Sequence, residues 1–179
     1  PDAFLNWIRA RGFDAIWMVG VWERGQDSRR RLLEDLGSMG ALRHFVPDVE
    51  PSEVLGGPFA IHSYVVPEVL GGEAALADLR HRMNERGLSL VLDFVANHTT
   101  RDCPWLGEHP SAYVRGIRGV APAEDCFTHR SAHGLPGQIA FGRDPYFPGW
   151  EQTAQLEIRS AKARSLLSEA IVSVAARCD

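Results

Sequence analysis

The order of apolar and amphipathic segments along this 179-residue chain predicts an α/β fold. Two apolar runs, at 15–22 and 88–95, have the composition of strands, and stretches with helical periodicity at 2–11 and 75–83 precede them. A further amphipathic stretch follows at 163–174. Alternation of this kind is typical of right-handed βαβ units around a parallel sheet. Because two parallel strands cannot make a sheet that is buried on both faces, we expect part of a larger α/β domain.

The N-terminal third supplies the first helix and the first strand. Apolar residues at helical spacing followed by Gly12 predict a helix over 2–11 that ends at the glycine. The run Ala15–Trp22 is nearly continuously apolar, so we expect a parallel strand buried on both faces. Residues 26–57 are charged and repeatedly broken by glycine and proline, which predicts an irregular excursion with one short helix near 30–36.

The rest of the chain repeats the helix-then-strand order. The helical stretch at 75–83 lies between Gly71-Gly72 and a stop at Gly87, and the strand at 88–95 follows directly. Residues 99–153 are rich in proline, glycine and aromatic residues, which predicts a long functional loop or a small inserted subdomain. The last helix has a clean apolar stripe and Ser160 as its expected N-cap.

Composition and charge exclude several classes of partner. The net charge is -4 and the one basic run, Arg29–Arg31, is short, so we expect no nucleic-acid binding. No apolar run approaches the ~20 residues that a membrane span needs, so we expect no membrane partner. Three irregularly spaced cysteines (Cys103, Cys126 and Cys178) favour reduced thiols over a disulfide framework, which indicates a cytoplasmic protein.

Polar residues end the second apolar run. In Leu90–Thr99, LVLDFVANHT, Asp93 lies near the end of the predicted strand and Asn97 and His98 lie just beyond it. One interpretation is structural: Asp93 caps a turn and His98 is a satisfied interior histidine. The other is a ligand site, in which a buried acid requires an arginine, a ligand hydroxyl or backbone N–H groups as its partner.

The segment LVLDFVANHT resembles the first signature region of the α-amylase family of glycoside hydrolases, glycoside hydrolase family thirteen, in which D-x-x-x-N-H follows an apolar strand. Further similar segments follow the family's order, at 12–17, 58–64 with 71–72, 77–87, 144–150 and 153–156. The resemblance implies a partial TIM (β/α)8 barrel covering roughly helix 1 to helix 3, with a domain-B-like excursion after strand 3. Residues 1–98 and 154–179 would be the partial barrel, and 99–153 the excursion.

The resemblance also implies a sugar subsite. His98 would hydrogen-bond the hydroxymethyl group of the sugar at the cleavage point, and Asp93 would orient an arginine near the nucleophile. Phe59, where the family usually has tyrosine, would give a pyranose an apolar face to stack on. The substrate would be an α-glucan, an oligosaccharide or a disaccharide. Trp105 and Trp150 in the excursion are candidates for contacts at the rim of the site.

Asn97 matches a residue that binds calcium in the calcium-dependent members of the family. The chain departs from the family pattern around it: Ser63 replaces an expected aspartate, and Gln155 and Glu157 replace the Asp and Asn of P-D-L-N. Because Ca²⁺ takes six to eight oxygen ligands, this loss of carboxylates argues against a calcium site. We therefore expect no cofactor.

The C-terminal residues Arg177-Cys178-Asp179 resemble the family's R-x-D, which carries the nucleophile. However, the helical stripe runs through Val174, and a nucleophile at the far end of the next strand needs about 5 more residues of extended chain. We therefore expect Asp179 to be a decoy that matches the Asp just before the fourth strand. Retaining glycosidases use two carboxyl groups, which the family takes from strands four and five, so the chain alone is predicted to be inactive.

Three alternatives remain open at this level. Cys126, His129 and His133, with Cys103, could ligate zinc, although a structural zinc site needs four suitably placed ligands. The parent protein could be a non-catalytic, amylase-like interaction subunit. The chain could also be a small independent α/β domain with a chance match. The reaction type, whether hydrolysis, isomerisation or transglycosylation, depends on loops outside this sequence.

Overall fold

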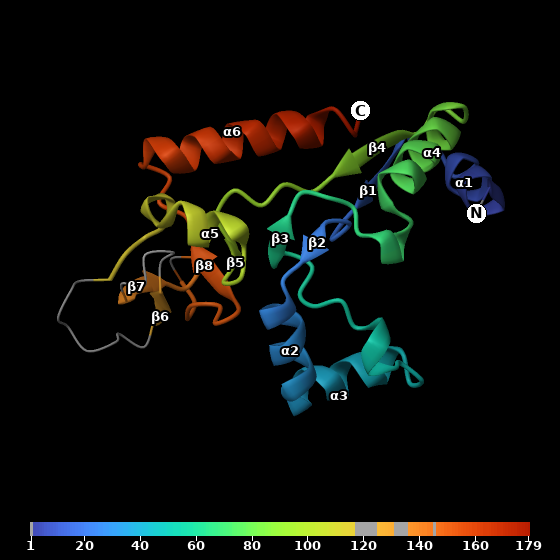
Figure 1. The fold of residues 1–179 in the computed structure, drawn as a ribbon. Coiled ribbons are helices and arrows are strands. Elements are labelled where there is room, and N and C mark those ends of the chain that lie inside the picture. Colours follow the sequence, from blue (N-terminus) through green and yellow to red (C-terminus); the bar gives the residue numbers. More distant parts are fainter. Residues whose placement is uncertain (1, 117–124, 131–135, 145) are drawn as a thin grey trace. The chain divides into compact units, whose positions relative to one another are not determined.

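A computed structural model describes residues 2–116, 125–130, 136–144 and 146–179 (Figure 1). The chain divides into two compact units. Unit 1 consists of residues 1–23, 64–94 and 168–179, and unit 2 consists of residues 24–63 and 95–167. Each unit is described by itself.

Unit 1 is built on a parallel pair of strands. Its elements are α1 (Asp2–Arg9), β1 (Ala15–Met18), the 3-10 helix η2 (Glu68–Leu70), α4 (Gly72–Asn84), β4 (Ser89–Leu92) and the last part of α6 (Ala161–Ala175). β1 pairs with β4 in register from Ala15 opposite Ser89 to Met18 opposite Leu92. The glycines expected to bound α4 do so: Gly71 and Gly87 have φ of +92° and +67°, in the left-handed region that favours glycine. The predicted helices at 2–11 and 75–83 are thus confirmed.

The expectation that the first strand is buried on both faces is wrong for the described chain. Trp17 and Val91 are paired across the strands and so share a face, and they are 63% and 40% exposed. Leu90 on the opposite face is fully buried, and β4 packs against α4. The strand is also shorter than predicted, because the chain leaves the extended conformation before Gly20, which has a φ of +73°.

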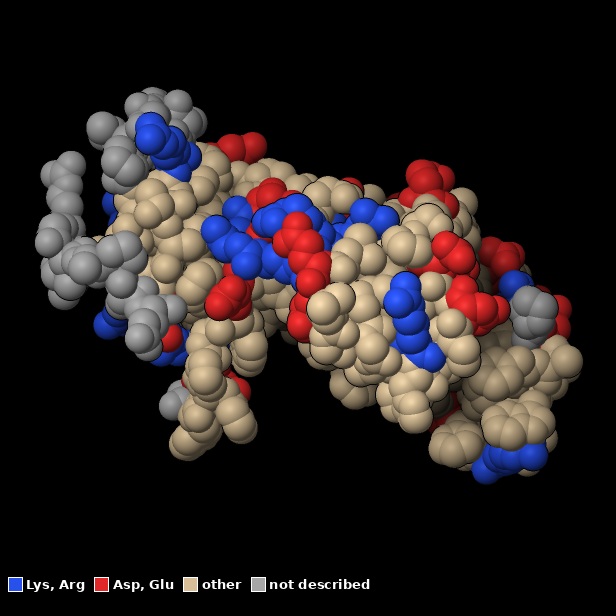
Figure 2. All heavy atoms as spheres, turned by 90° about the horizontal axis from the view of Figure 1, so that it is seen from below, with Lys and Arg blue, Asp and Glu red and all other residues tan. Residues whose placement is uncertain are grey.

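Unit 2 begins with two helices where one short helix was predicted. α2 (Gln26–Glu34) and α3 (Leu36–Phe45) meet at Asp35, whose carboxylate accepts hydrogen bonds from the backbone N–H groups of Gly37 and Ser38 and so caps α3. Asp27 pairs with Arg30 and Arg31 at helical spacing on α2. Figure 2 shows acidic and basic side chains next to one another on one face of the molecule. Ion pairs stabilise α2 and a capping side chain stabilises α3. Neither feature produces the apolar periodicity from which helices are predicted in a sequence.

The rest of unit 2 includes residues 99–153, for which a long loop or a small subdomain is predicted. Its elements are η1 (Pro51–Glu53), β3 (Ile61–Ser63), which pairs with β2 (Glu23–Arg24), then β5 (His98–Thr100), α5 (Pro104–Glu108), η3 (Pro110–Ala112), β6 (Cys126–Arg130), β7 (Pro136–Ala140), β8 (Thr153–Gln155) and the start of α6. β6 and β7 form an antiparallel hairpin. β5 and β8 are antiparallel, with His98 opposite Gln155 and Thr100 opposite Thr153, so the two ends of the excursion are joined.

The helix predicted at the C-terminus is confirmed as α6. Ser160 Oγ accepts a hydrogen bond of 3.4 Å from the backbone N–H of Ala163, as its predicted N-cap role requires. The buried side chains of α6 are Ala163, Leu166, Leu167, Ala170 and Val174. Among the described helices, none has the length and apolar character to cross a membrane.

Candidate functional site

Asp93 follows the carboxyl end of β4 and is 6% exposed. Its Oδ1 accepts a hydrogen bond of 3.3 Å from the backbone N–H of Gly20, in the segment that follows β1. Its backbone carbonyl accepts a hydrogen bond of 2.9 Å from the indole of the fully buried Trp22. Since β1 and β4 are parallel, Asp93 lies at the edge where both strands end. Backbone N–H groups are one of the partners that the sequence predicts for this acid.

His98 opens β5 in unit 2 and is 7% exposed. Its Nδ1 lies 3.2 Å from the side-chain amide nitrogen of Asn97. Its ring centroid is 5.0 Å from that of Trp150. Burial lowers the pKa of His98 to about 4, although a hydrogen bond to the backbone carbonyl of Phe59 acts in the opposite direction. The imidazole is therefore neutral near pH 7.

The contact with Asn97 determines which ring nitrogen of His98 carries the proton. An amide NH2 group can only donate, so His98 Nδ1 accepts and the proton lies on Nε2.

Phe59 presents its side chain to solvent, with 48% of its surface exposed. An exposed ring of this kind offers the flat apolar surface that a pyranose can stack on. The structure thus brings Phe59, Asn97 and His98 together in unit 2, with Phe59 contacting His98 through its backbone. Asp93 belongs to unit 1.

Gly142 is a site residue that the sequence analysis missed. A Cβ at this position would lie 2.7 Å from the Cβ of His98 and 2.5 Å from Oγ1 of Thr153, closer than side chains approach one another. Gly142 also forms a bridge with Trp150, whose backbone N–H donates to the Gly142 carbonyl at 2.7 Å. The lack of a side chain at Gly142 is what lets this strand segment pack directly on His98.

Asn97 takes part in hydrogen bonds that join three segments. Gln155 Nε2 donates to Asn97 Oδ1 and to the Asn97 backbone carbonyl, both at 2.8 Å. Gln155 Oε1 accepts from the backbone N–H of Arg143 at 3.0 Å, and Asn97 Nδ2 donates to the Arg143 carbonyl at 3.0 Å. We call Asn97, Gln155 and the Arg143 backbone the amide clamp.

The sequence also suggested a zinc site, and the part of the chain that the structure describes contains no cluster of zinc ligands. There, no group of three or more His, Cys, Asp or Glu residues is placed to hold a metal ion. Cys126 and His129 are three residues apart on β6, so their side chains point to opposite faces of the strand. His133, a member of that hypothetical site, lies outside the described residues.

Asp179 is held at the start of β4. Its Oδ2 accepts a hydrogen bond of 2.9 Å from the backbone N–H of Leu90, and its own N–H donates to the Leu90 carbonyl at 3.0 Å. The bond from Leu90 and the bond and ion pair with Arg80 hold the pKa of Asp179 below its usual range. Leu90 precedes Asp93 by about 10 Å of extended chain. Asp179 therefore contacts the half of β4 opposite to the end that Asp93 follows.

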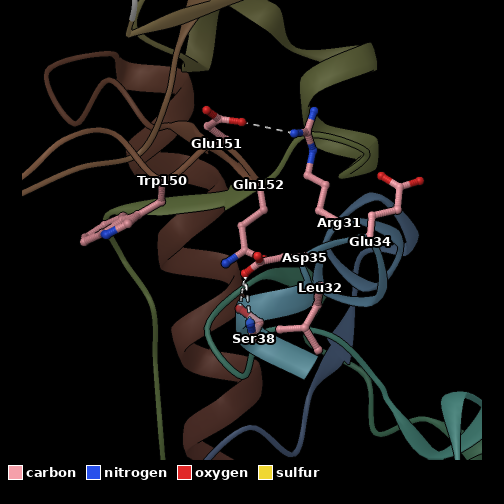
Figure 3. A pocket seen from close by; sticks show the side chains of 8 residues that line it. All are labelled: Arg31, Leu32, Glu34, Asp35, Ser38, Trp150, Glu151 and Gln152. Atoms are coloured by element: carbon pink, nitrogen blue, oxygen red, sulfur yellow. Dashed lines mark hydrogen bonds and ion pairs between the residues drawn. The ribbon is translucent and has the colours of Figure 1, made fainter. Parts of the chain in front are cut away.

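A hollow in unit 2, of about 430 Å³, lies between α2, α3 and the segment 150–152 (Figure 3). Its polar groups are engaged within the chain: Asp35 accepts from Ser38, and Arg31 contacts Glu151 at 3.3 Å. In Figure 3 the ring of Trp150 points away from Asp35 and Ser38. Its contact is with His98 instead, so Trp150, predicted at the rim, packs against the candidate site residue.

Comparison with known proteins finds a matching family model and similar solved structures. The family model described as alpha amylase, catalytic domain, matches residues 4–131. No curated protein sequence matches the chain.

Solved structures resemble the chain over nearly its full length. An alpha-amylase from Lactobacillus plantarum is 20% identical, with a TM-score of 0.64, and the match covers 99% of this chain and 32% of that one. The trehalose-6-phosphate hydrolase of Bacillus licheniformis is 15% identical, with a TM-score of 0.65 and coverage of 98% and 29%. The isomaltulose synthase of Erwinia rhapontici is 18% identical, with a TM-score of 0.62 and coverage of 98% and 28%.

At these identities the likeness concerns the fold: a partial TIM-barrel-like α/β arrangement, with no closed barrel in the described residues. This chain spans about a third of the length of each of these structures, as the coverage of 28–32% shows.

Proposed function

The chain belongs to the alpha-amylase family of catalytic domains, and from this premise we propose that it carries part of the substrate site of an enzyme acting on α-glucosidic bonds with retention. The reaction is hydrolysis or transglycosylation. The substrate class is an α-glucan, an oligosaccharide or a disaccharide. The names of the solved relatives include an amylase, a trehalose-6-phosphate hydrolase and an isomaltulose synthase, so the proposal extends to the class of bond and no further.

The observation that carries the proposal is the position of Asp93. Barrel enzymes build their active sites at the carboxyl ends of parallel strands, because the interior below is filled with packed side chains. Asp93 lies at this end of β4, and the backbone N–H of Gly20 from the segment after β1 reaches its carboxylate. In this role Asp93 is a positioning residue: it orients an arginine beside the nucleophile.

His98 and Phe59 are proposed to contact the sugar. A neutral imidazole can hydrogen-bond a hydroxyl group without attracting an anion, and the low pKa of His98 keeps it neutral at pH 7. The exposed Phe59 ring supplies an apolar face next to the backbone carbonyl that His98 contacts. Together they hold a pyranose by stacking on one side and hydrogen bonding at its edge.

The reacting carboxyl groups are proposed to lie outside this chain. Retention requires a nucleophile and an acid about 5–5.5 Å apart, flanking the scissile bond. Asp179 is not assigned either role, since its carboxylate is bonded to Leu90 and Arg80 at the start of β4. We therefore expect the 179-residue chain to position substrate and to leave the glycosidic bond intact.

Two measurements test this function. Purified residues 1–179 should give no turnover of a maltooligosaccharide, and turnover above a heat-denatured control would contradict the assignment of the reacting groups. A longer protein containing this chain should cleave α-linked substrates with retained anomeric configuration, read by NMR, and should leave β-linked cellobiose intact. If that protein cleaves no α-glucoside, the family match reflects a non-catalytic relative.

A further inference from the structure

The Asn97 position, where the family resemblance implies a calcium ligand, contains a closed set of hydrogen bonds. Gln155 presents its NH2 group to two oxygens of Asn97, the side-chain Oδ1 and the backbone carbonyl, both at 2.8 Å. Arg143 binds both amides through its backbone: its N–H donates to Gln155 Oε1 and its carbonyl accepts from Asn97 Nδ2, each at 3.0 Å. We propose that this amide clamp replaces calcium in joining the ends of the excursion, so that the protein needs no metal for its stability.

The donor set does not fit a calcium ion. Ca²⁺ takes six to eight oxygens at 2.3–2.6 Å, and its affinity rises with the number of charged ligands. In the clamp, the Asn97 carbonyl accepts from two N–H groups, Gln155 Nε2 at 2.8 Å and the Leu156 backbone at 3.0 Å, so both of its lone pairs are used. Asn97 Oδ1 and Gln155 Oε1 each accept from a close N–H donor, which leaves less room for a cation to bind them. All three oxygens are neutral.

The carboxylates near the clamp in sequence are engaged elsewhere. Glu157, two residues after Gln155, is bonded to Arg159, which together with the Arg159 backbone N–H lowers the Glu157 pKa to about 2. The guanidinium of Arg143 lies 2.7 Å from Asp125. A cation at Asn97 would thus find Glu157 and Asp125 already paired with arginines. The Asp144 carboxylate, next to Arg143, accepts a hydrogen bond of 2.8 Å from the backbone N–H of Tyr146.

The two amides are fixed in orientation by their surroundings. If Gln155 were turned over, its NH2 group would face the N–H of Arg143 and its oxygen would face two carbonyl groups. Both contacts would be repulsive, and each would leave a polar group unsatisfied. The arrangement is therefore self-consistent without an ion.

The clamp links the chain segments that a bridging ion would link. Asn97 precedes β5, Gln155 ends β8, and Arg143 follows the glycine that packs on His98. One glutamine side chain therefore ties together three segments that are 12 to 58 residues apart. The same Asn97 amide reaches His98 Nδ1 at 3.2 Å, which makes Gln155 a positioning residue for His98.

The direct test measures the melting temperature of the protein in EDTA and in millimolar calcium. Calcium at about 100-fold over its dissociation constant would raise the melting temperature by several degrees if a native site existed. We expect no shift, and we expect terbium luminescence to show no bound ion. A calcium-dependent rise that Asn97→Ala abolishes would overturn the proposal. These readouts do not depend on glycosidase activity, so they stand or fall separately from the proposed function.

A variant with a matched control sharpens the result. Gln155→Glu keeps the size of the side chain but removes both N–H donors, so the melting temperature in EDTA should fall by several degrees and calcium should partly restore it. Gln26→Glu changes an exposed glutamine at the start of α2, and it should show a smaller fall and no calcium response. If both variants behave alike, the clamp has no special role; if Gln155→Glu does not fold, the calcium measurement on the unaltered protein still decides.

Discussion

The two strand pairs β1–β4 and β5–β8 differ in how fully the described chain covers them. On the parallel pair, Trp17 and Val91 form an apolar face that is open to solvent. On the antiparallel pair, all of His98–Thr100 is buried, although every one of these side chains is polar.

The contrast lies in what the described residues cover: an apolar face is exposed on the parallel pair, and a polar strand is buried in the antiparallel pair. Two of the three buried polar side chains of β5 have partners within unit 2: Thr99 Oγ1 lies 2.9 Å from the Tyr113 hydroxyl, and His98 contacts Asn97. The third, Thr100 Oγ1, has no hydrogen-bond partner among the described residues. The open face of β1 and β4 is what a barrel strand pair presents when its neighbouring strands and helices are not part of the chain. That agrees with a chain that spans about a third of its solved relatives.

The largest expected effect tests the close packing on β5. Gly142→Val should destabilise unit 2 by about 3 kcal/mol, because the new side chain would overlap His98 and Thr153. The measurement is the free energy of unfolding in urea. Gly137→Val, on β7 with nothing within 4 Å of the new Cβ, is the control and should change stability by less than about 0.5 kcal/mol. Equal losses would show that the packing on His98 is loose.

The second prediction concerns pH. The pKa of His98 is about 4 in the folded chain and 6.5 in the unfolded one, so between these values the unfolded state binds more protons. The contribution of the neutral His98 side chain to the free energy of unfolding is complete above pH 6.5. It is lost as the pH falls, and the free energy of unfolding should be lower by about 2 kcal/mol at pH 5 than at pH 7. His98→Gln should remove this part of the pH dependence, and His44→Gln on α3 should leave it. An identical pH profile for all three proteins would mean that His98 is solvated.

A smaller effect is expected at the partner of Thr99. Tyr113→Phe removes the hydroxyl that lies 2.9 Å from Thr99 Oγ1 and should lower the free energy of unfolding by about 1 kcal/mol. The exposed Tyr146 gives the matched control, since Tyr146→Phe should leave urea unfolding unchanged. No loss in Tyr113→Phe would show that the buried polar contacts of β5 are not needed.

The smallest effect is expected on the open face of the parallel pair. Trp17→Thr should change the stability of the 179-residue chain by less than about 0.5 kcal/mol, because the side chain is exposed, and should reduce aggregation. In a longer protein that covers this face, the same substitution should lower stability by about 3 kcal/mol. Equal small effects in both proteins would mean that the face stays open and that the parallel pair is complete.

The sequence predicted the elements whose signals are local. The helices α1, α4 and α6 have apolar stripes with a period of 3.6, and glycine or serine marks their ends, so their existence followed from short windows of sequence. α3 was missed because Asp35 stabilises it by capping, and a capping residue is equally typical of a turn. The strand β1 was predicted too long because an apolar composition does not reveal that Gly20 turns the chain.

What the sequence determined by itself was the family and the types of residue at the end of the second strand: an acid, an amide and an imidazole at a spacing that resembles a known signature. Only the tertiary structure decided what each of them contacts. Gly20 reaches Asp93 from 73 residues away, and Gln155 reaches Asn97 from 58 residues away. The physical reason is that hydrogen bonds depend on distances of about 3 Å between atoms, and residues so far apart in sequence come that close only through the path of the folded backbone.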